Sequence, residues 1–378
     1  MMGTRGVPAH YGGFETAIEE IGQRLAERGH QVTVYCRQPT DGEKVPRTYL
    51  GMDLVTLPAI RSKAVETLSH TGISALHLLF TRRHDAVFLF NSANSPFLPL
   101  LRLRRMPVAV HVDGLEWKRS KWSGGGQRYY RMAESLAVRW ADALIADADG
   151  IADYYRDEFA ASTTVIAYGA PILAELPADR LAELGLEPGR FHLVVARFEP
   201  ENNIDMIVAG YRRSGARFPL VVVGGAPYSD EYTKRVHTAA GNDPRIRFQG
   251  PVWDQEQLDQ LYGHACTYLH GHSVGGTNPS LLRAMGAGAA VGAFDVVFNR
   301  EVLGPDGRFF ADERELSALV ESAEADRVAT RADAESCRLR PSQRDRWDDV
   351  ATGSDSLAIA LAAGMSRRKE ATGRRRGR

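Results

Sequence analysis

The residues best suited to chemistry lie between His270 and Leu303, HGHSVGGTNPSLLRAMGAGAAVGAFDVVFNREVL. Residues 273–277 are small, so the backbone there can approach a ligand closely. Asn278 is typical of a helix N-cap and Pro279 of the first helical position. A glycine-rich loop that enters a helix N-terminus presents free amides and the positive end of the helix dipole, which suits a phosphate. The same pattern fits a plain tight loop between a strand and a helix equally well.

The elements that must position this loop alternate along the chain. Apolar runs and helical spacing predict two series of strands and helices, separated by a proline-containing segment. Strands that alternate with helices predict parallel sheets covered on both faces. We therefore expect an α/β protein with two Rossmann-like, doubly wound domains that face each other across a ligand cleft. The expected parts are an N-terminal domain (1–172), a linker (173–190), a second domain (191–345), a helix crossing back (346–365) and a basic disordered tail (366–378).

The composition is that of a globular protein, with 44% hydrophobic and 25% charged residues. Because 47 basic residues balance 47 acidic ones, no net charge draws the chain to nucleic acid. Cys36, Cys266 and Cys337 are far apart, which predicts free thiols in a reducing compartment. We find neither an apolar run of about eighteen residues nor a signal peptide, so a cytoplasmic protein is expected.

Four stretches, taken together and in order, carry a family resemblance. They are GTRGVPAHYGGFET, VHVDGLEWKRSKW, RFEPENNID and HSVGGTNPSLL followed by AM and FNREVL. The set resembles GT-B-fold glycosyltransferases of the retaining family-four type, and within them a bacterial polysaccharide branch with rhamnosyltransferase-like proteins. The resemblance covers residues 3–363. It implies that residues 1–172 form the acceptor-side domain and that residues 191–345 form the nucleotide-sugar-binding domain. It implies transfer of a sugar, with rhamnose as the first guess, from a nucleoside diphosphate donor to a polysaccharide or lipid-linked glycan. No metal or other cofactor is implied.

The resemblance also implies roles for individual residues. An arginine at position 197 would neutralise the leaving diphosphate, because guanidinium matches phosphate in shape and charge. The lysine that the wider family carries five residues later is Asn202 here, so amide donors would replace that cation. The expected catalytic residues are His111, Asp113 and Arg197. The expected donor-binding residues are Gly12, Gly13, Arg197, Asn202, Asn203, Gly275, Gly276, Thr277, Asn278, Arg283 and Glu301. Glu116, Trp117 and Lys118 are the expected acceptor-binding residues.

One departure from the family pattern bears on activity. The two glutamates that family-four enzymes carry at an E-x7-E spacing correspond to Gly275 and Arg283. Arginine accepts no hydrogen bond, so the donor ribose would lose its acceptor at a cost of about 1–3 kcal/mol. The sequence therefore leaves three functions open: a transferase impaired by Arg283, a degenerate relative that binds nucleotide or glycan without turnover, and a sugar-nucleotide epimerase.

Two further expectations concern the chain start and a surface. Gly3-Thr4-Arg5-Gly6 stands where an apolar strand should feed the first loop. We therefore expect that the first strand is missing, because the coding sequence begins upstream or is truncated. Residues 97–106 mix leucines with three arginines, and residues 366–378 hold seven Lys or Arg against one Glu. These segments predict peripheral contact with an anionic inner membrane, although a core helix and a solvated tail fit them equally well.

Overall fold

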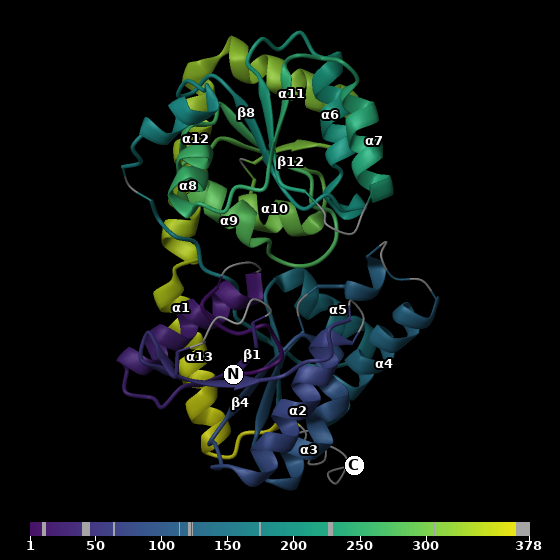
Figure 1. Cartoon of the computed structure of the whole chain (residues 1–378), viewed down its shortest axis with the longest axis vertical. Helices are drawn as coiled ribbons and strands as arrows, with labels where there is room; N and C mark the ends of the chain where they lie inside the picture. The colour runs from purple at the N-terminus through teal and green to yellow at the C-terminus, as the bar shows by residue number, and fades with distance from the viewer. Residues whose placement is uncertain are drawn as a thin grey trace. The chain divides into compact units, whose positions relative to one another are not determined.

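The computed structural model describes residues 1–9, 13–39, 46–62, 65–112, 114–119, 122, 124–173, 175–225, 230–305 and 307–367. The chain divides into two compact units (Figure 1). Unit 1 comprises Met1–Tyr168 and the residues from Trp347 onward, and unit 2 comprises Gly169–Arg346. Both units are built on parallel strands flanked by helices, which confirms the predicted α/β class.

Unit 1 contains a four-stranded parallel sheet in the order β4-β5-β6-β7 and a three-stranded sheet in the order β1-β3-β2. Its strands are β1 (Thr33–Arg37), β2 (Thr48–Tyr49), β3 (Met52–Leu57), β4 (Val87–Phe90), β5 (Val108–His111), β6 (Ala143–Ala146) and β7 (Thr164–Val165). Its helices are α1 (Gly13–Glu27), α2 (Glu66–Phe80), η1 (Ser92–Phe97), α3 (Leu98–Leu103), η2 (Glu116–Lys118), α4 (Gly124–Trp140), α5 (Asp149–Phe159) and α13 (Trp347–Ala362).

The place of the expected first strand is taken by two residues. Met2 bridges in parallel to β4, where the Phe90 amide donates to the Met2 carbonyl at 2.9 Å. On the other side the Tyr35 amide of β1 donates to the Met1 carbonyl at 3.0 Å. Because residues 1 and 2 bond to both neighbours, they join the two sheets of unit 1. Among the described residues no strand precedes α1, as expected, and Met1 and Met2 make only isolated pairings in its place.

Helix α13 belongs to unit 1, where it packs against α1 (Figure 1). Arg24 of α1 pairs with Asp348 at 2.9 Å, and His30 pairs with Asp355 at 2.8 Å. After this helix the Arg367 amide donates to the Asp142 carbonyl at 2.9 Å. The segment after α13 is therefore anchored beside the amino ends of β5 and β6.

Unit 2 is one six-stranded parallel sheet in the order β10-β9-β8-β11-β12-β13. Its strands are β8 (His192–Val195), β9 (Leu220–Val223), β10 (Ile246–Gly250), β11 (Thr267–His270), β12 (Val291–Phe294) and β13 (Arg308–Phe310). Its helices are η3 (Asp179–Leu184), η4 (Pro200–Asn202), α6 (Ile204–Arg213), α7 (Asp230–Ala240), α8 (Gln255–His264), α9 (Pro279–Gly286), α10 (Val297–Leu303), α11 (Glu313–Ala325) and α12 (Arg327–Arg344). The chain winds outward from β8 to β10 and then returns to β11, so the direction of winding reverses between β8 and β11.

Helices cover both faces of this sheet. The apolar core on one face is formed with α6, α7 and α11, while α8 and α12 cover the other face (Figure 1). Continuous burial along β9 (LVVV) is what a parallel strand with both faces covered requires. Close packing extends to the backbone, since a Cβ on Gly210 of α6 would lie 2.8 Å from the Glu313 carbonyl oxygen of α11.

The segment 173–190, predicted to be a linker, instead packs on unit 2 wherever it is described. Leu181 of η3 is fully buried, and Asp179 accepts a hydrogen bond from Gln260 of α8 at 2.9 Å. Its polar side chains therefore make hydrogen bonds and ion pairs with unit 2, such as that between Arg180 and Asp254 at 3.0 Å. Among the described residues, no helix is both long and apolar enough to cross a membrane.

Candidate functional site

Two loops meet at the carboxyl ends of β8 and β11, where the winding of unit 2 reverses. His272 Nδ1 donates to Asn202 Oδ1 at 2.7 Å, and Asn203 Nδ2 donates to the Gly271 carbonyl at 2.8 Å. The Ser273 amide donates to the Glu201 carbonyl at 2.9 Å. Ligands of open α/β sheets bind outside the strand carboxyl ends at such a reversal. The two loops therefore frame the candidate site of unit 2.

The loops approach each other so closely that one position requires glycine. A Cβ on Gly271 would lie 2.1 Å from the Asn202 carbonyl oxygen and 2.8 Å from Ile207 Cδ1. Neither neighbour is the free end of a flexible chain, because one is backbone and the other is core. Any larger residue at 271 would separate the loops.

Asn202 and Asn203 were expected to donate to the sugar-nucleotide. The structure gives both amides partners within the loops, since Asn202 Nδ2 also donates to the Arg197 carbonyl at 2.8 Å. Asn202 is buried, and Asn203 adopts a left-handed conformation with φ of 48°. Both residues therefore position the loop, and their direct contact with a donor stays a prediction.

Arg197 lies at the carboxyl end of β8 with an exposed side chain. Within the described ranges its guanidinium makes no ion pair. Asn202 holds the Arg197 carbonyl, and the Arg197 guanidinium is available to bind an anion.

Helix α9 begins as the sequence predicts. Asn278 is its N-cap and accepts from the Ser280 amide at 2.9 Å, with Pro279 at the first helical position. Gly275 has φ of 111°, which favours glycine, and Gly276 and Thr277 connect it to the helix. The loop and cap have the form of an anion-binding helix entrance, and contact with phosphate stays a prediction.

Three residues near these loops were missed by the sequence analysis. Asn299 of α10 is buried and donates to the His272 carbonyl at 2.9 Å and to the Phe294 carbonyl at 2.8 Å. It therefore ties the loop after β11 to the carboxyl end of β12. The expected donor residue Glu301 lies two positions further along α10 and is partly buried.

His270 and His272 are the other two. Burial, together with the charge of His272, lowers the pKa of His270 to about 3, so its imidazole is neutral. Its Nδ1 pairs with the Tyr268 hydroxyl at 3.0 Å, and its Nε2 has no hydrogen-bond partner among the described residues. The sequence signal was the HGH triplet at the end of an apolar strand, which places both rings at the ligand edge of the sheet.

Arg283 has a partner that the sequence does not reveal. Its Nε and a terminal guanidinium nitrogen donate to the two carboxylate oxygens of Asp259 at 2.6 and 2.8 Å. The two side chains are 24% and 12% exposed. Asp259 lies on α8, so the pair joins α8 to α9. The guanidinium is therefore committed to a carboxylate on its own unit.

In unit 1, His111 ends β5 and is 2% exposed. Its ring stacks on Phe90 with centroids 4.6 Å apart and lies 6.4 Å from the Tyr168 ring. Burial lowers the pKa of His111 to about 3, so the imidazole is neutral and can exchange hydrogen bonds but carries no charge. Its Nδ1 has no partner in the part of the chain that the structure describes.

The remaining unit 1 candidates are only partly described. Gly12 and Asp113 lie outside the described residues, whereas Gly13 is the first residue of α1. The loop before α1 is held by that helix, since the Arg5 amide donates to Glu15 Oε1 at 3.0 Å and the Ala9 amide donates to Glu19 Oε2 at 2.8 Å.

The expected acceptor residues form η2, which packs on α4. Glu116 pairs with Arg119 at 2.9 Å, and Lys118 is exposed. The Trp117 ring lies 4.9 Å from the Arg131 guanidinium of α4. The Trp117 ring is therefore held by a cation, and the residue is partly exposed.

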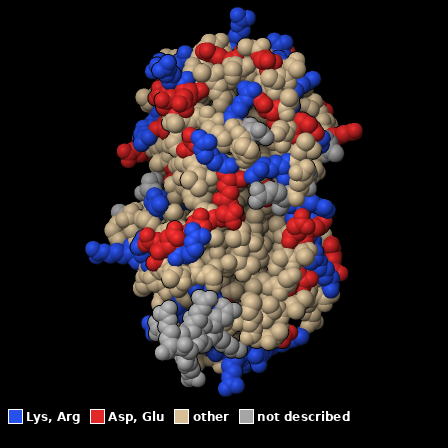
Figure 2. Space-filling view, turned by 180° about the vertical axis from the view of Figure 1, so that it is seen from behind, with Lys and Arg blue, Asp and Glu red and all other residues tan. Residues whose placement is uncertain are grey.

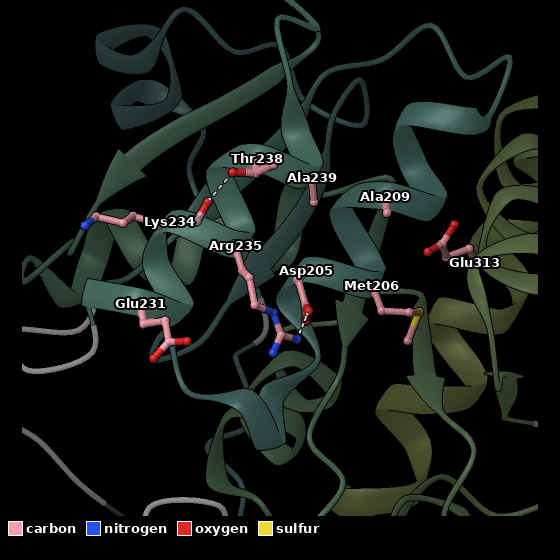
Figure 3. Close-up of a pocket in the computed structure, with 9 residues that line it drawn as sticks. All are labelled: Asp205, Met206, Ala209, Glu231, Lys234, Arg235, Thr238, Ala239 and Glu313. Carbon is pink, nitrogen blue, oxygen red and sulfur yellow. Dashed lines mark hydrogen bonds and ion pairs between the residues drawn. The ribbon is translucent and has the colours of Figure 1, made fainter.

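A hollow of about 570 Å³ lies on the helical layer of unit 2 (Figure 3). Its lining comes only from α6, α7 and the start of α11. Within it the Arg235 guanidinium bonds the Asp205 carboxylate (Figure 3). Because no strand-end loop lines this hollow, we do not assign the donor to it.

Asp205 contributes to the site in another way. The Tyr232 hydroxyl donates to Asp205 Oδ1 at 2.7 Å and accepts from the Ile204 amide at 2.8 Å. This hydroxyl therefore serves the first turn of α6, which has no side-chain N-cap. It fixes the helix that follows the Asn202 loop directly.

Among the described residues, no group of three or more His, Cys, Asp or Glu is arranged to hold a metal ion. Metal independence stays a prediction, since segments outside the described residues also contain acidic residues.

Comparison with known proteins finds a family match within the second unit. Residues 181–336 match the family described as glycosyl transferases group 1. The matched residues lie inside unit 2 (Gly169–Arg346). Residues 1–171 match a domain of unknown function, DUF1972.

Solved structures show the same fold. HepE (Alr3699) from Anabaena in complex with UDP superposes with a TM-score of 0.73 at 17% identity, covering 93% of this chain and 96% of its own. Sucrose-phosphate synthase from Thermosynechococcus elongatus superposes with a TM-score of 0.80 at 20% identity, covering 93% and 94%. These are GT-B glycosyltransferases, so the predicted fold class is confirmed.

A curated relative supports the same group. The GtfA subunit of the UDP-N-acetylglucosamine–peptide N-acetylglucosaminyltransferase of Streptococcus gordonii is 27% identical over 145 residues. The alignment covers 36% of this chain and 28% of that relative. It therefore supports a glycosyltransferase domain without assigning a substrate.

Proposed function

We propose that the protein is a glycosyltransferase that moves a sugar from a nucleoside diphosphate donor to a glycan acceptor, with retention of configuration and without a metal ion. The observation that carries the proposal is the pair of loops at the carboxyl ends of β8 and β11, inside the matched glycosyl transferase domain. The UDP bound by HepE supports a nucleoside diphosphate as the donor's leaving group.

The residues of unit 2 suit departure of a diphosphate. The exposed guanidinium of Arg197 offers two parallel N–H donors to phosphate oxygens, and the entrance to α9 offers backbone amides. Both groups are in place before the bond breaks, which is the condition for effective stabilisation of a developing charge. Asn202, His272 and Asn299 hold the loops in register and act as positioning residues.

The residues of unit 1 suit contact with sugars. The neutral imidazole of His111 can accept or donate a hydrogen bond to a sugar hydroxyl. The partly exposed Trp117 ring and Lys118 provide stacking and polar contacts for an acceptor glycan. The resemblance favours rhamnose as the sugar and a polysaccharide or lipid-linked glycan as the acceptor.

The test measures nucleoside diphosphate release from UDP-glucose, UDP-N-acetylglucosamine and dTDP-rhamnose, each with and without a glycan acceptor. Transfer requires acceptor, an epimerase changes the sugar without one, and a degenerate relative binds donor but releases nothing. Arg197→Ala should lower kcat about a hundredfold at an unchanged Tm, because one preorganised charge is lost from the leaving group. Arg314→Ala, which removes an exposed arginine of α11, is the matched control. If both variants released diphosphate at the same rate, Arg197 would have no place in the mechanism.

A further inference from the structure

The amino ends of the unit 1 strands carry a cluster of arginines beside exposed apolar side chains. Arg82 and Arg83 precede β4, and Arg102 and Arg105 precede β5. The amino ends of parallel strands lie at one edge of a sheet. These arginines therefore share the edge opposite to the carboxyl ends of the strands, where His111 lies. We call residues 76–83 and 102–105 the amino-edge surface.

Hydrogen bonds tie the two segments of the amino-edge surface together. The Arg104 guanidinium donates to the Leu79 carbonyl at 2.8 Å and to the Thr81 carbonyl at 2.9 Å, at the end of α2. The Arg83 guanidinium donates to the Arg105 carbonyl at 3.0 Å. The ends of α2 and α3 are therefore held side by side, as Figure 1 also shows.

Large apolar side chains stand exposed on this surface. Phe80, the last residue of α2, is 87% exposed, and Leu103, the last residue of α3, is 74% exposed. Leu76, one turn before Phe80, is 49% exposed. Single exposed apolar residues are common, but three on two helix ends that are bonded together form a patch.

The charge around this patch is one-sided although the whole chain is neutral. Residues 81–86, 102–107, 139–142 and 366–367 hold seven Lys or Arg and two Asp or Glu. One of those acids, Asp142, is engaged, since it accepts from the Ser366 hydroxyl at 2.7 Å and from the Val108 amide at 3.1 Å. Lys and Arg side chains also edge the end of unit 1 at the foot of Figure 2, with few acidic ones visible.

Arg367, the last residue that the structure describes, lies at the same edge. It donates through its guanidinium to the Val138 carbonyl at 2.6 Å, in the last turn of α4. The sequence beyond it, RKEATGRRRGR, contains six Lys or Arg and lies outside the described residues.

We propose that the amino-edge surface docks the protein on an anionic lipid bilayer. Phe80 and Leu103 enter the headgroup region, while the arginines contact lipid phosphates and keep their aliphatic stems along the apolar side chains. A second copy of this chain is the less suitable occupant, because two surfaces of the same strong charge repel each other. A nucleic acid would use the arginines but gives no reason for exposed leucine and phenylalanine. The docking is independent of the proposed transferase activity, and it brings the protein to the surface where a lipid-linked glycan would be met.

Co-sedimentation of the full chain with vesicles tests the proposal. We expect binding to phosphatidylcholine vesicles with 30% phosphatidylglycerol at 50 mM salt, at least tenfold weaker binding to pure phosphatidylcholine, and release at 0.5 M salt. Phe80→Ser with Leu103→Ser should weaken binding about tenfold. Arg82→Gln with Arg102→Gln should weaken it about thirtyfold, since each arginine near the surface adds about 1 kcal/mol. Val328→Ser with Arg314→Gln is the matched control, because Val328 is 82% exposed and both residues lie on unit 2.

Three outcomes overturn the proposal. Equal binding to neutral and anionic vesicles removes the electrostatic argument. If the Phe80/Leu103 and Arg82/Arg102 variants both bind like the control, the C-terminal segment alone holds the vesicle and the amino-edge surface does not. Tighter binding to a DNA duplex than to vesicles, unaffected by Phe80→Ser, makes the surface a general polyanion site. None of these readouts depends on sugar transfer, so a failed transferase assay leaves the test intact.

Discussion

The ion pair between Arg283 and Asp259 yields the sharpest prediction about the candidate site. It is bidentate, with contacts of 2.6 and 2.8 Å, and both side chains are largely but not fully buried, at 24% and 12% exposure. Exposed ion pairs contribute about 0–1 kcal/mol, and removal of one partner from a buried pair costs about 3–5 kcal/mol. We therefore expect a coupling free energy of about 1–2 kcal/mol between these two side chains.

A double-mutant cycle in urea measures this coupling. Arg283→Met and Asp259→Asn should each lower the free energy of unfolding, and the double variant should lose less than the sum of the two. The slope m should stay constant, so that shifts in the midpoint report stability alone. Additivity within about 0.3 kcal/mol would show that the pair is not formed in solution and would refute the geometry on which the reasoning depends.

The same pair changes what a return to the family pattern should do. Arg283→Glu alone places a second carboxylate against Asp259, and the two acids repel each other. This repulsion offsets the affinity gained from a restored hydrogen-bond acceptor for the ribose of the donor. Arg283→Glu with Asp259→Asn restores an acceptor without that repulsion. We expect the double variant to bind nucleoside diphosphate about tenfold more tightly than the unaltered protein, because about 1–3 kcal/mol of unpaired hydroxyl cost is recovered.

Titration calorimetry with UDP and dTDP measures this affinity. Arg283→Met with Asp259→Asn is the matched control, since it breaks the pair without supplying an acceptor. If the glutamate variant and this control bound equally well, position 283 would not lie at the ribose, and the departure from the family pattern would concern only the packing of α8 on α9.

The remaining predictions concern the loops and one buried acid. Gly271→Ala should weaken donor binding at least tenfold, because its Cβ would lie 2.1 Å from the Asn202 carbonyl oxygen. Gly225→Ala is the control and should leave donor binding unchanged, because its Cβ would have nothing within 4 Å. Titration calorimetry measures the donor affinity of both variants. Burial raises the pKa of Glu134 from 4.5 to about 7. The unfolded chain therefore loses this proton at a lower pH than the folded protein, and the free energy of unfolding should fall as pH rises from about 4.5 to 7. Urea titrations of Glu134→Gln should not show this fall. Tyr232→Phe should lower the unfolding free energy by about 1–2 kcal/mol in the same assay, because the first turn of α6 loses its hydroxyl partner.

Much of the fold could be predicted because its signals are local. The apolar run of β9 and the Asn-Pro entrance of α9 each specify an element within a few residues. The pairings of Met1 and Met2 could not be predicted, since two residues give no periodicity to detect. Only their bonds to β1 and β4 identify Met1 and Met2 as part of the sheet. The polar helix α12, with a proline inside, gave no apolar pattern and was also missed.

The contacts of the candidate site could not be predicted, because they join residues far apart in the chain. Asn202 and His272 are 70 positions apart, and the sequence gives no sign that their side chains bond. The partner of Arg283 lies 24 positions upstream on a different helix. Motifs identified the residue types at the strand ends. The role of each residue depends on whether its hydrogen-bond donors and acceptors are already paired with a neighbour in the fold.

That distinction changes the meaning of the two departures from the family pattern. Asn202 stands where the wider family has a cation, and its amide holds the carbonyl of Arg197 and the ring of His272 instead of reaching outward. Arg283 stands where the family has an acid, and Asp259 neutralises it. Arg197 is therefore left as the exposed guanidinium at the carboxyl end of β8, and its orientation depends on a neutral amide. The loss of a cation at position 202 weakens the attraction of the site for diphosphate at any distance. A better-held Arg197, by contrast, acts only when the donor is bound. Contacts that are stronger in the transition state than in the ground state are the ones that raise kcat.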